Sequence, residues 1–271
     1  MHRPAGGRIL QEMTAAQDKF LPGRITARTD HAPDLWSVRL RVEAPFHFAP
    51  GQYATLGLEK HGKLVERAYS IVSSPYEPEL EFFFELVPDG QLTPLLHKLQ
   101  PGDTLSMRKA FKGRFTLDIQ SGRTRHLLLA TVTGVAPFVS YVRTLYRDWK
   151  EGRFPAGHHL YLLEGASRSW EFGYHHELQT LAAEVPWLTY VATVSRPWED
   201  PAWKGETGRV DDLIRKYTDH WQLSAQNATG YLCGHPDMIE HGKGILRRAG
   251  FPKENLKEEI YWIPAKPAKT R

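Results

Sequence analysis

The chain has a single cysteine, Cys233, and no long hydrophobic run among its 271 residues. One thiol excludes an internal disulfide, and it excludes an iron–sulfur cluster held by cysteines alone. No apolar stretch approaches the ~20 residues that a membrane helix needs. No apolar segment with a small-residue cleavage site stands near the N-terminus. We therefore expect a cytoplasmic protein with neither a membrane span nor an export signal.

A large excess of one charge is absent as well. The 35 Lys and Arg residues stand against 31 Asp and Glu residues, so the formal net charge is +4, and no run of basic residues is longer than two. This excludes a basic arm for nucleic acid. It suits an acidic protein partner or phosphate-bearing ligands, although an ordinary mixed surface would look the same.

Metal-ligand spacings and a G-x-S-x-G serine motif are lacking too. Neighbouring histidines stand at 158–159 and 175–176, but adjacent residues of a strand or helix point in different directions, so neither pair chelates well. We expect no metal site.

The sequence pattern changes once, near residue 120. Residues 20–117 hold six short segments of alternating apolar and polar residues, punctuated by Gly and Pro, which is typical of an antiparallel sandwich or barrel. From residue 126 onwards strand-like and helix-like segments alternate, which indicates βαβ units and a parallel sheet covered on both faces. The expected strands of this second part are HLLLATV, LYLLEGA, LTYVATVS, GYLCG and EEIYW.

The predicted fold is therefore a six-stranded antiparallel β-barrel followed by a doubly wound α/β domain with a five-stranded parallel sheet. We place the barrel domain at residues 20–120 and the α/β domain at residues 121–262. The polar residues 1–19 and the basic residues 263–271 are expected to be flexible.

Residues with binding chemistry follow the strands of the predicted parallel sheet, where ligands bind in such folds. Thr133 and Gly134 follow the first strand, and a proline then starts a helix whose N-terminus suits a pyrophosphate, unless the motif is a plain turn. Ser195 and Arg196 follow the third strand, and Arg168 follows the second. A hydroxyl and guanidinium groups at strand ends can bind a phosphate, or they can be solvated loop residues.

Cys233 ends the fourth strand, in the stretch LCGHP. Because Gly and Pro follow it directly, we expect the thiol at the rim of the ligand cleft, where a reactive ring could touch it. A small buried core residue is the alternative interpretation.

The stretch RAYS, at Arg67, Ala68, Tyr69 and Ser70, places a cation, an aromatic ring and a hydroxyl within a strand-like segment. With the two-residue period of a strand, Arg67 and Tyr69 share one face and Ser70 lies on the other. Arg67 can neutralise a pyrophosphate, the Tyr69 ring can lie against a planar cofactor, and the Ser70 hydroxyl can reach a ring nitrogen. The later stretch DGQLTP offers a second turn and helix start to phosphate oxygens.

These motifs carry a resemblance to a known family. RAYS, with PGQYATL before it and DGQLT after it, resembles the FAD motifs of ferredoxin–NADP(+) reductases, and TGVAPF, VSRP and CGHP resemble the nicotinamide-nucleotide motifs of the same superfamily. EIYW is similar to the aromatic ending of the bacterial ferredoxin/flavodoxin–NADP(+) reductases. The resemblance implies an FAD-binding barrel, an NADP-binding second domain, and electron transfer between NADPH, with hydride to flavin N5, and the carriers ferredoxin or flavodoxin.

On the flavin side, the resemblance implies that Arg67 binds the FAD pyrophosphate, that Tyr69 stacks on the isoalloxazine and that Ser70 hydrogen-bonds near flavin N5. Ala68 belongs to the same cofactor-binding motif. The FAD phosphates would be cradled by Gly90, Leu92 and Thr93.

On the nucleotide side, the resemblance implies that Tyr261 covers the other flavin face until nicotinamide displaces it, and that Trp262 stacks on the FAD adenine. Thr133 and Gly134 hold the NADP pyrophosphate, and Cys233 lies beside the nicotinamide C4. The resemblance also implies that Ser195 and Arg196 bind the 2′-phosphate of NADP, with Arg168 nearby. The predicted catalytic residues are Ser70, Cys233 and Tyr261.

The sequence departs from the family pattern at three places. Val132 stands at a position where the family usually has a glycine, and that glycine tightens the first turn. Glu240 stands where some members have arginine, so a preference for NADP over NAD rests on Ser195 and Arg196. Nine residues follow Trp262, where the similar aromatic ending terminates.

Two other functions stay open. An NADH-dependent reductase of the same superfamily would reduce free flavin or serve an oxygenase, and a degenerate member would be a nucleotide-sensing or interaction module. If the chain transfers electrons to ferredoxin or flavodoxin, the basic residues Lys109, Lys112 and Arg114 are the expected docking site for this acidic carrier.

Overall fold

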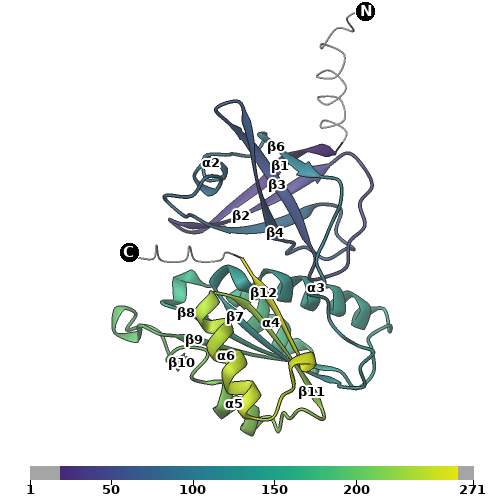
Figure 1. Cartoon of the computed structure of the whole chain (residues 1–271), viewed down its shortest axis with the longest axis vertical. Helices are drawn as coiled ribbons and strands as arrows, with labels where there is room; N and C mark the ends of the chain where they lie inside the picture. The colour runs from purple at the N-terminus through teal and green to yellow at the C-terminus, as the bar shows by residue number, and fades with distance from the viewer. Residues whose placement is uncertain (1–18, 262–271) are drawn as a thin grey trace, which may run out of the picture.

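The computed structural model describes residues 19–261, which form two sheets stacked along the long axis of the molecule (Figure 1). The first sheet is antiparallel, and its six strands follow the order β4-β3-β6-β1-β2-β5. Its elements are β1 (Phe20–Ala32), β2 (Leu35–Val42), β3 (Tyr53–Lys60), β4 (Lys63–Ser70), β5 (Leu80–Glu85), the one-turn helix α2 (Thr93–Leu96) and β6 (Thr104–Arg108).

A bridge between the two edge strands closes this sheet into the predicted barrel. Ile71, directly after β4, pairs with Phe82 of β5, and the amide of Val72 donates to the carbonyl of Glu81 at 2.8 Å. Closure removes most of the free edge that an open sheet would expose. The end of β4 is thereby fixed beside β5.

Alternate residues of β2 explain how one wall of the barrel faces two environments. Trp36, Val38 and Leu40 point into the barrel core, where each is at most 2% exposed. Leu35, on the other face, belongs to an apolar cluster shared with the second domain. The two-residue period of a strand produces this division.

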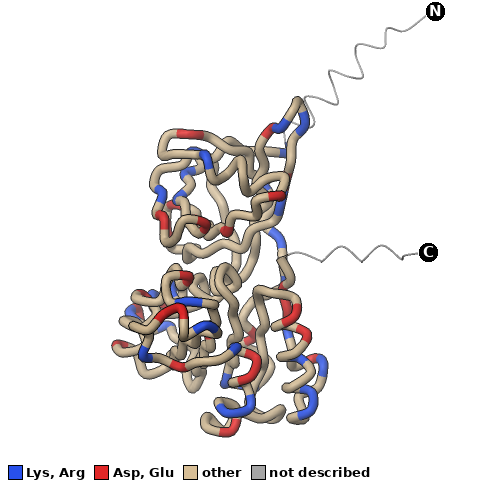
Figure 2. Tube along the Cα trace, turned by 90° about the vertical axis from the view of Figure 1, so that its left-hand side faces the viewer, with Lys and Arg blue, Asp and Glu red and all other residues tan. Residues whose placement is uncertain are grey.

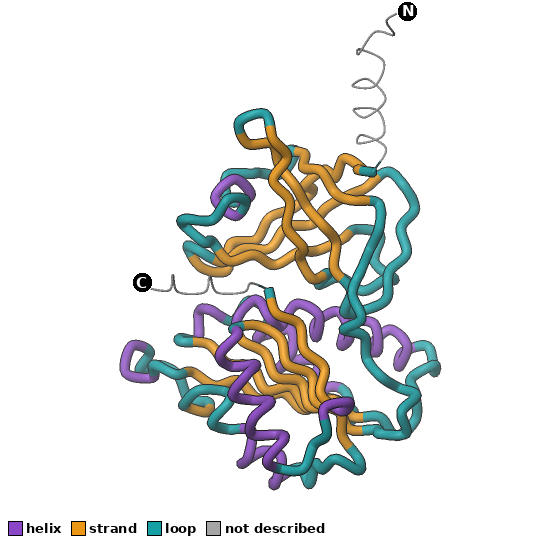
Figure 3. Tube along the Cα trace, in the orientation of Figure 1, coloured by secondary structure: helices purple, strands orange, loops and turns teal. Residues whose placement is uncertain are grey.

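The second sheet is parallel and has the order β10-β9-β8-β7-β11-β12 (Figure 3). Its strands are β7 (Arg125–Thr131), β8 (His159–Ala166), β9 (Leu188–Val194), β10 (Glu206–Thr207), β11 (Ala228–Gly234) and β12 (Leu256–Ile260). The expectation of five strands was therefore one short. The missing strand, β10, has two residues and pairs only with Thr193 and Val194, so it is too short to give a periodic signal.

Helices cover both faces of this sheet, as the alternation of strands and helices predicted. The helices are α3 (Ala136–Lys150), α4 (His175–Glu184), α5 (Ile214–His220) and α6 (Pro236–Arg248), with 3-10 turns η1 (Val132–Val135), η2 (Ser169–Glu171), η3 (Pro197–Glu199) and η4 (Lys253–Asn255). Leu128 of β7 packs in the cluster of α3 and α4, whereas its neighbours Leu127 and Leu129 pack in that of α5 and α6. The two sheets use residues 20–108 and 125–260, and the division at residue 120 stays a prediction.

The seam between the domains is apolar and is bridged by hydrogen bonds. Barrel residues enter the core cluster of the second domain, namely Leu35, Val72, Phe83 and Phe115. The buried carboxylate of Glu81 accepts hydrogen bonds at 2.7 Å from both Arg143 of α3 and the hydroxyl of Tyr174. A buried charge with this many partners is satisfied in place, so it favours one arrangement of the two domains.

Positions of Lys and Arg alternate with positions of Asp and Glu along the trace of both domains (Figure 2). Within residues 19–261, the helices are all too short or too polar to cross a bilayer.

Candidate active site at the domain seam

A cluster of four side chains lies where the end of β4 meets the carboxyl end of the parallel sheet. Ser70 ends β4, and its Oγ donates to Oε1 of Glu259 at 2.8 Å. Glu259 lies on β12 in register with Cys233 of β11. Tyr261 follows β12, and its hydroxyl donates to the carbonyl of Thr133 at 3.2 Å. The three predicted catalytic residues are therefore brought to one place.

Burial raises the pKa of each titratable side chain in this cluster. It raises the pKa of the Glu259 carboxyl, while the hydrogen bond from Ser70 opposes the shift. Burial, followed by the charge of Glu259, raises the pKa of the Cys233 thiol well above its usual value. Burial and then Cys233 do the same for the phenol of Tyr261. The thiol is thus a neutral side chain at physiological pH, which suits packing beside a ligand and not nucleophilic attack.

The sequence led us to expect Cys233 at the open rim of the ligand cleft, but the structure does not place it there. Its exposed fraction is 0%, and its side chain belongs to the apolar cluster beneath α3. The tyrosine after β12 packs against this same cluster, and its phenol and the Glu259 carboxyl are near enough to shift the thiol's pKa. Its role beside nicotinamide stays a prediction.

The RAYS motif lies on an edge strand of the first sheet. Arg67 and Ala68 are exposed, and the Arg67 guanidinium donates only to the neighbouring carbonyl of Glu66, at 2.7 Å. Within residues 19–261 no carboxylate pairs with it. Tyr69 is partly buried, and its ring lies edge-on to Phe84 with the centroids 4.8 Å apart. A guanidinium without a protein counter-ion and a phenol ring on one strand fit a ligand that carries phosphates and a flat ring.

The turn at Gly90, Leu92 and Thr93, predicted to bind the FAD phosphates, is stabilised by contacts within the protein. The Thr93 hydroxyl accepts from the amide of Val87 at 3.0 Å, and the amide of Gly90 donates to the Val87 carbonyl at 2.8 Å. Leu92 packs in the barrel core and is 2% exposed. The structure thus holds this turn in shape, while its contact with FAD stays a prediction.

Gly134 is required by the close approach of two backbones. A Cβ at this position would stand 2.2 Å from the carbonyl oxygen of Cys233. The 3-10 turn η1 can therefore lie against the end of β11, which places the Thr133 carbonyl within reach of Tyr261. The glycine that the sequence suggested for a pyrophosphate serves this packing first.

Val132 has a backbone conformation that β-branched residues avoid. Its φ is 45°, in the left-handed region, at the position where the family pattern has glycine. This conformation costs a non-glycine residue about 1–2 kcal/mol. The side chain is also partly buried against Ala166, Phe172 and their neighbours, which offsets part of the cost.

We expect Val132→Gly to be less destabilising than Val132→Ala, the reverse of their usual order. Both variants lose the packing of the isopropyl group, but only glycine relieves the strain of the positive φ. The denaturation midpoint of each variant in urea measures the order. An alanine variant at least as stable as the glycine variant would show that the turn stores no strain.

The arginines predicted to bind a phosphate converge at the ends of β8 and β9. The amide of Ser195 donates to Ala166 at 2.9 Å, and that of Arg196 donates to Ser167 at 3.0 Å, so the ladder between the strands continues into their loops. Arg168 and Arg196 both approach the carboxylate of Glu199. Trp262 lies outside the described residues.

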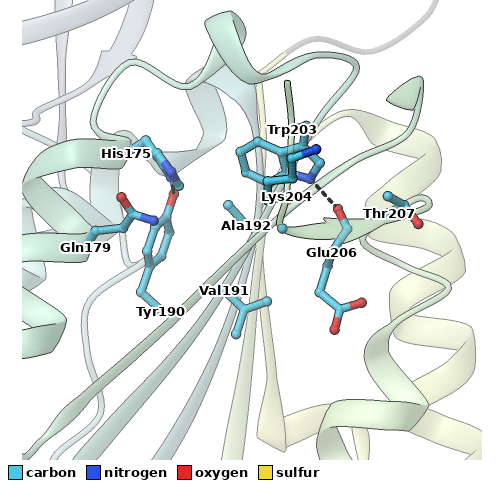
Figure 4. A pocket seen from close by; sticks show the side chains of 10 residues that line it. His175, Gln179, Tyr190, Val191, Ala192, Trp203, Lys204, Glu206 and Thr207 are labelled. Carbon is cyan, nitrogen blue, oxygen red and sulfur yellow. Dashed lines mark hydrogen bonds between the residues drawn. The ribbon is translucent and has the colours of Figure 1, made fainter. Parts of the chain in front are cut away.

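A hollow lies elsewhere, beside β9 (Figure 4). It has a volume of about 510 Å³ and is lined by His175 and Gln179 of α4, by Tyr190 of β9, and by the loop that carries Trp203. Beneath it, the Tyr190 hydroxyl donates to the buried Glu164 at 2.6 Å. None of the predicted site residues lines this hollow.

The sequence reasoning missed Glu259 and Glu199. Glu259 stands two residues before Tyr261 in EEIYW, so the period of a strand could have placed the two on one face. Glu199 stands three residues after Arg196, the spacing that puts it above that arginine in a turn.

Comparisons with known proteins agree with this arrangement. Residues 22–116 match the model of an oxidoreductase FAD-binding domain, and residues 128–243 match that of an oxidoreductase NAD-binding domain. The flavodoxin/ferredoxin–NADP reductase of Escherichia coli (strain K12) is 32% identical over 225 residues, which cover 81% of this chain and 87% of that protein. The phenol 2-monooxygenase reductase component DmpP of Pseudomonas sp. (strain CF600) is 30% identical over 243 residues, which cover 88% and 65%.

A solved structure shares the fold. The ferredoxin NADP+ reductase from Neisseria gonorrhoeae with bound FAD and NADP superposes with a TM-score of 0.78 at 24% identity, covering 90% of this chain and 99% of that one. The fold and the seam thus define a two-domain oxidoreductase with an FAD-binding and a nucleotide-binding domain. Within that class, the chain belongs to the flavodoxin/ferredoxin–NADP reductase family. The predicted family and fold class are confirmed.

Proposed function

We propose that the chain is an FAD-dependent oxidoreductase that transfers electrons between NADPH and a one-electron carrier, ferredoxin or flavodoxin. The observation that carries this proposal is the hydrogen bond from Ser70 to Glu259, because it joins the RAYS strand to the carboxyl end of the parallel sheet. A flavin bound there would supply the chemistry, taking up the hydride of NADPH and passing electrons singly to the carrier. Membership of the reductase family supports the assignment.

The residues of the chain supply binding, orientation and a dry environment. Arg67 would pair with the pyrophosphate of FAD, and Tyr69 would lie against its ring system. Ser70 would orient the reacting edge of the ring and is itself held in place by Glu259. Tyr261 covers Cys233 and excludes water until the nicotinamide ring replaces it.

Stopped-flow mixing tests the function. The purified protein, loaded with FAD, is mixed with NADPH or NADH while the absorbance of the flavin is followed, and is then mixed with oxidised ferredoxin or flavodoxin. We expect rapid bleaching with NADPH and recovery of the absorbance with a carrier. A colourless protein that takes up no FAD would instead indicate the degenerate sensing or interaction module.

The carrier is expected to dock on the segment that joins the two sheets. Lys109, Lys112 and Arg114 are exposed there, and their positive charges suit an acidic carrier. The second mixing step, repeated at low and high salt, tests this surface, because a docking site built on charge loses rate as salt rises. A cytoplasmic location stays a prediction of the sequence.

A second candidate is a reductase that uses NADH and serves an oxygenase. The similarity to the phenol 2-monooxygenase reductase component and the carboxylate of Glu199 beside both arginines favour it. The ratio of kcat/KM for NADPH to that for NADH separates the two candidates.

We expect Tyr261→Ser to bind NADP+ at least tenfold more tightly than the wild-type protein. The nicotinamide ring must displace the phenol, which is partly buried and hydrogen-bonded to Thr133, and serine removes that cost. Titration with NADP+ should then change the flavin absorption spectrum more strongly. Tyr261→Phe is the matched control: it keeps the ring and should stay within a few fold of wild type. Equal titrations for wild type and Tyr261→Ser would show that this tyrosine only plugs the strand end.

A further inference from the structure

A carboxylate lies between the two arginines that the sequence assigned to the 2′-phosphate. Oε2 of Glu199 accepts from Nε of Arg168 at 2.6 Å, and Nη2 of the same guanidinium also pairs with this oxygen. Oε1 lies 3.8 Å from Nη1 of Arg196. One carboxylate thus uses both of its oxygens on two guanidinium groups, an arrangement that a phosphate oxyanion would also adopt.

The local fold fixes the two arginines and leaves the carboxylate free to move. The backbone ladder between β8 and β9 runs on through Ser167 and Arg196, so the arginines stand side by side on neighbouring loops. Glu199 ends the short turn η3 and is exposed. Among the contacts within residues 19–261, its carboxylate is held only by Arg168 and Arg196.

Glu171 differs from Glu199 in this respect. It also pairs with Arg168, at 3.0 Å, but its second oxygen accepts from the amides of Ser167 and Arg168 at 2.7 and 3.3 Å. These bonds tie Glu171 to its own turn, so it cannot leave without breaking the loop. Glu199 has no such bonds and is the carboxylate that an incoming anion can displace.

The charges at this point already balance. Two arginines, Arg168 and Arg196, face two carboxylates, Glu171 and Glu199. A phosphate dianion added to this group meets no net positive charge while Glu199 stays in place. The neutral 2′-hydroxyl of NADH would meet no such repulsion, because it carries no charge.

We infer that Glu199 is a specificity-determining residue that occupies the place of the 2′-phosphate between Arg168 and Arg196 and so weakens the preference for NADPH over NADH. This inference rests on the proposed function, since it concerns the nucleotide that the second domain binds. Binding of NADPH requires Glu199 to move out of the pair, whereas binding of NADH does not. The chain therefore uses both nucleotides, and its ratio of kcat/KM for NADPH to kcat/KM for NADH is smaller than the two arginines alone would give.

Isothermal titration with two nucleotides tests the inference apart from catalysis. Adenosine 2′,5′-bisphosphate and adenosine 5′-monophosphate differ only in the 2′-phosphate, and each is titrated into the FAD-loaded full chain. The measured quantity is the ratio of their dissociation constants. In Glu199→Gln this ratio should shift at least tenfold towards the bisphosphate, because one negative charge next to the phosphate is removed. Glu199→Ala, which cannot hydrogen-bond to Arg168, should shift it in the same direction.

Glu184→Gln is the control for net charge. Glu184 lies on α4 and pairs with Lys150, away from both arginines, so its variant should keep the wild-type ratio. A ratio within twofold of wild type in both Glu199 variants, or a shift towards the monophosphate, overturns the inference while the proposed function stands. Failure of the wild-type chain to bind either nucleotide would overturn both.

Discussion

The variant Glu164→Gln is expected to be more stable than the wild-type protein at alkaline pH, by about 5 kcal/mol at pH 9. Glu164 lies on the central strand β8 and is 0% exposed. One oxygen accepts from Tyr190 at 2.6 Å, and the other has no partner within residues 19–261. Burial raises the pKa of this carboxyl from 4.5 to about 8, and the hydrogen bond from Tyr190 only partly opposes the shift.

The sign follows from proton binding. Between pH 4.5 and about 8 the folded protein keeps a proton on Glu164 that the unfolded chain has released. Stability therefore falls as pH rises through this window, by about 1.4 kcal/mol per pH unit, and the contribution is fully present only below pH 4.5. Glutamine cannot titrate, so the variant loses this slope while it fills the same space.

Urea denaturation at intervals from pH 5 to pH 9 measures the effect as the difference between the two proteins. Subtracting one profile from the other cancels the pH dependence that comes from groups present in both proteins. His126, whose pKa burial lowers to about 3, is one of these groups. Tyr190→Phe provides a second test: it removes the only donor to the carboxylate among residues 19–261, so the decline should extend to higher pH. Parallel profiles for wild type and Glu164→Gln would mean that this carboxyl is ionised in the folded protein.

The fold could be predicted from the sequence where an element buries a clear pattern of apolar residues. The apolar run at 126–132 predicted β7 within a residue or two, and the proline after Gly134 predicted the start of a helix where α3 begins. Both signals are displayed directly by the sequence. The strand β10 could not be predicted, because two residues form no period and its pairing is set by the loop after η3.

The site could be predicted only in pieces. Cys233 was found because it ends an expected strand, Ser70 because RAYS places a hydroxyl beside a cation and a ring, and Tyr261 because EIYW resembles the aromatic ending of the family. The contact between Ser70 and Glu259 could not be found, since it joins residues 189 positions apart across two domains. In the same way, the pairing of Arg168 with Glu199 depends on β8 and β9 being neighbours in the sheet. The roles assigned to these residues towards FAD and NADPH stay predictions.

Ser70→Ala is expected to slow the reduction of bound flavin by NADPH about a hundredfold, the usual cost of removing one preorganised hydrogen-bonding group from an active site. Ser70 is 5% exposed, and its hydroxyl donates to Glu259 across the seam. Alanine removes the hydroxyl that orients the flavin edge and leaves a buried carboxyl without its donor. Flavin content should change little, because Arg67 and Tyr69 lie on the same strand and are untouched.

Two readouts distinguish this role from a structural one. In Ser70→Ala the Glu259 carboxyl loses the hydrogen bond that lowers its pKa, so any pH dependence of flavin reduction that arises from this carboxyl should move to higher pH. Ser73→Ala is the matched control, because Ser73 is a buried serine on the same segment whose hydroxyl accepts from the Glu81 amide at 3.0 Å, away from the cluster. It should lower stability without changing the reduction rate. Equal rates for Ser70→Ala and wild type would remove Ser70 from the active site and leave its bond to Glu259 as a clamp between two domains.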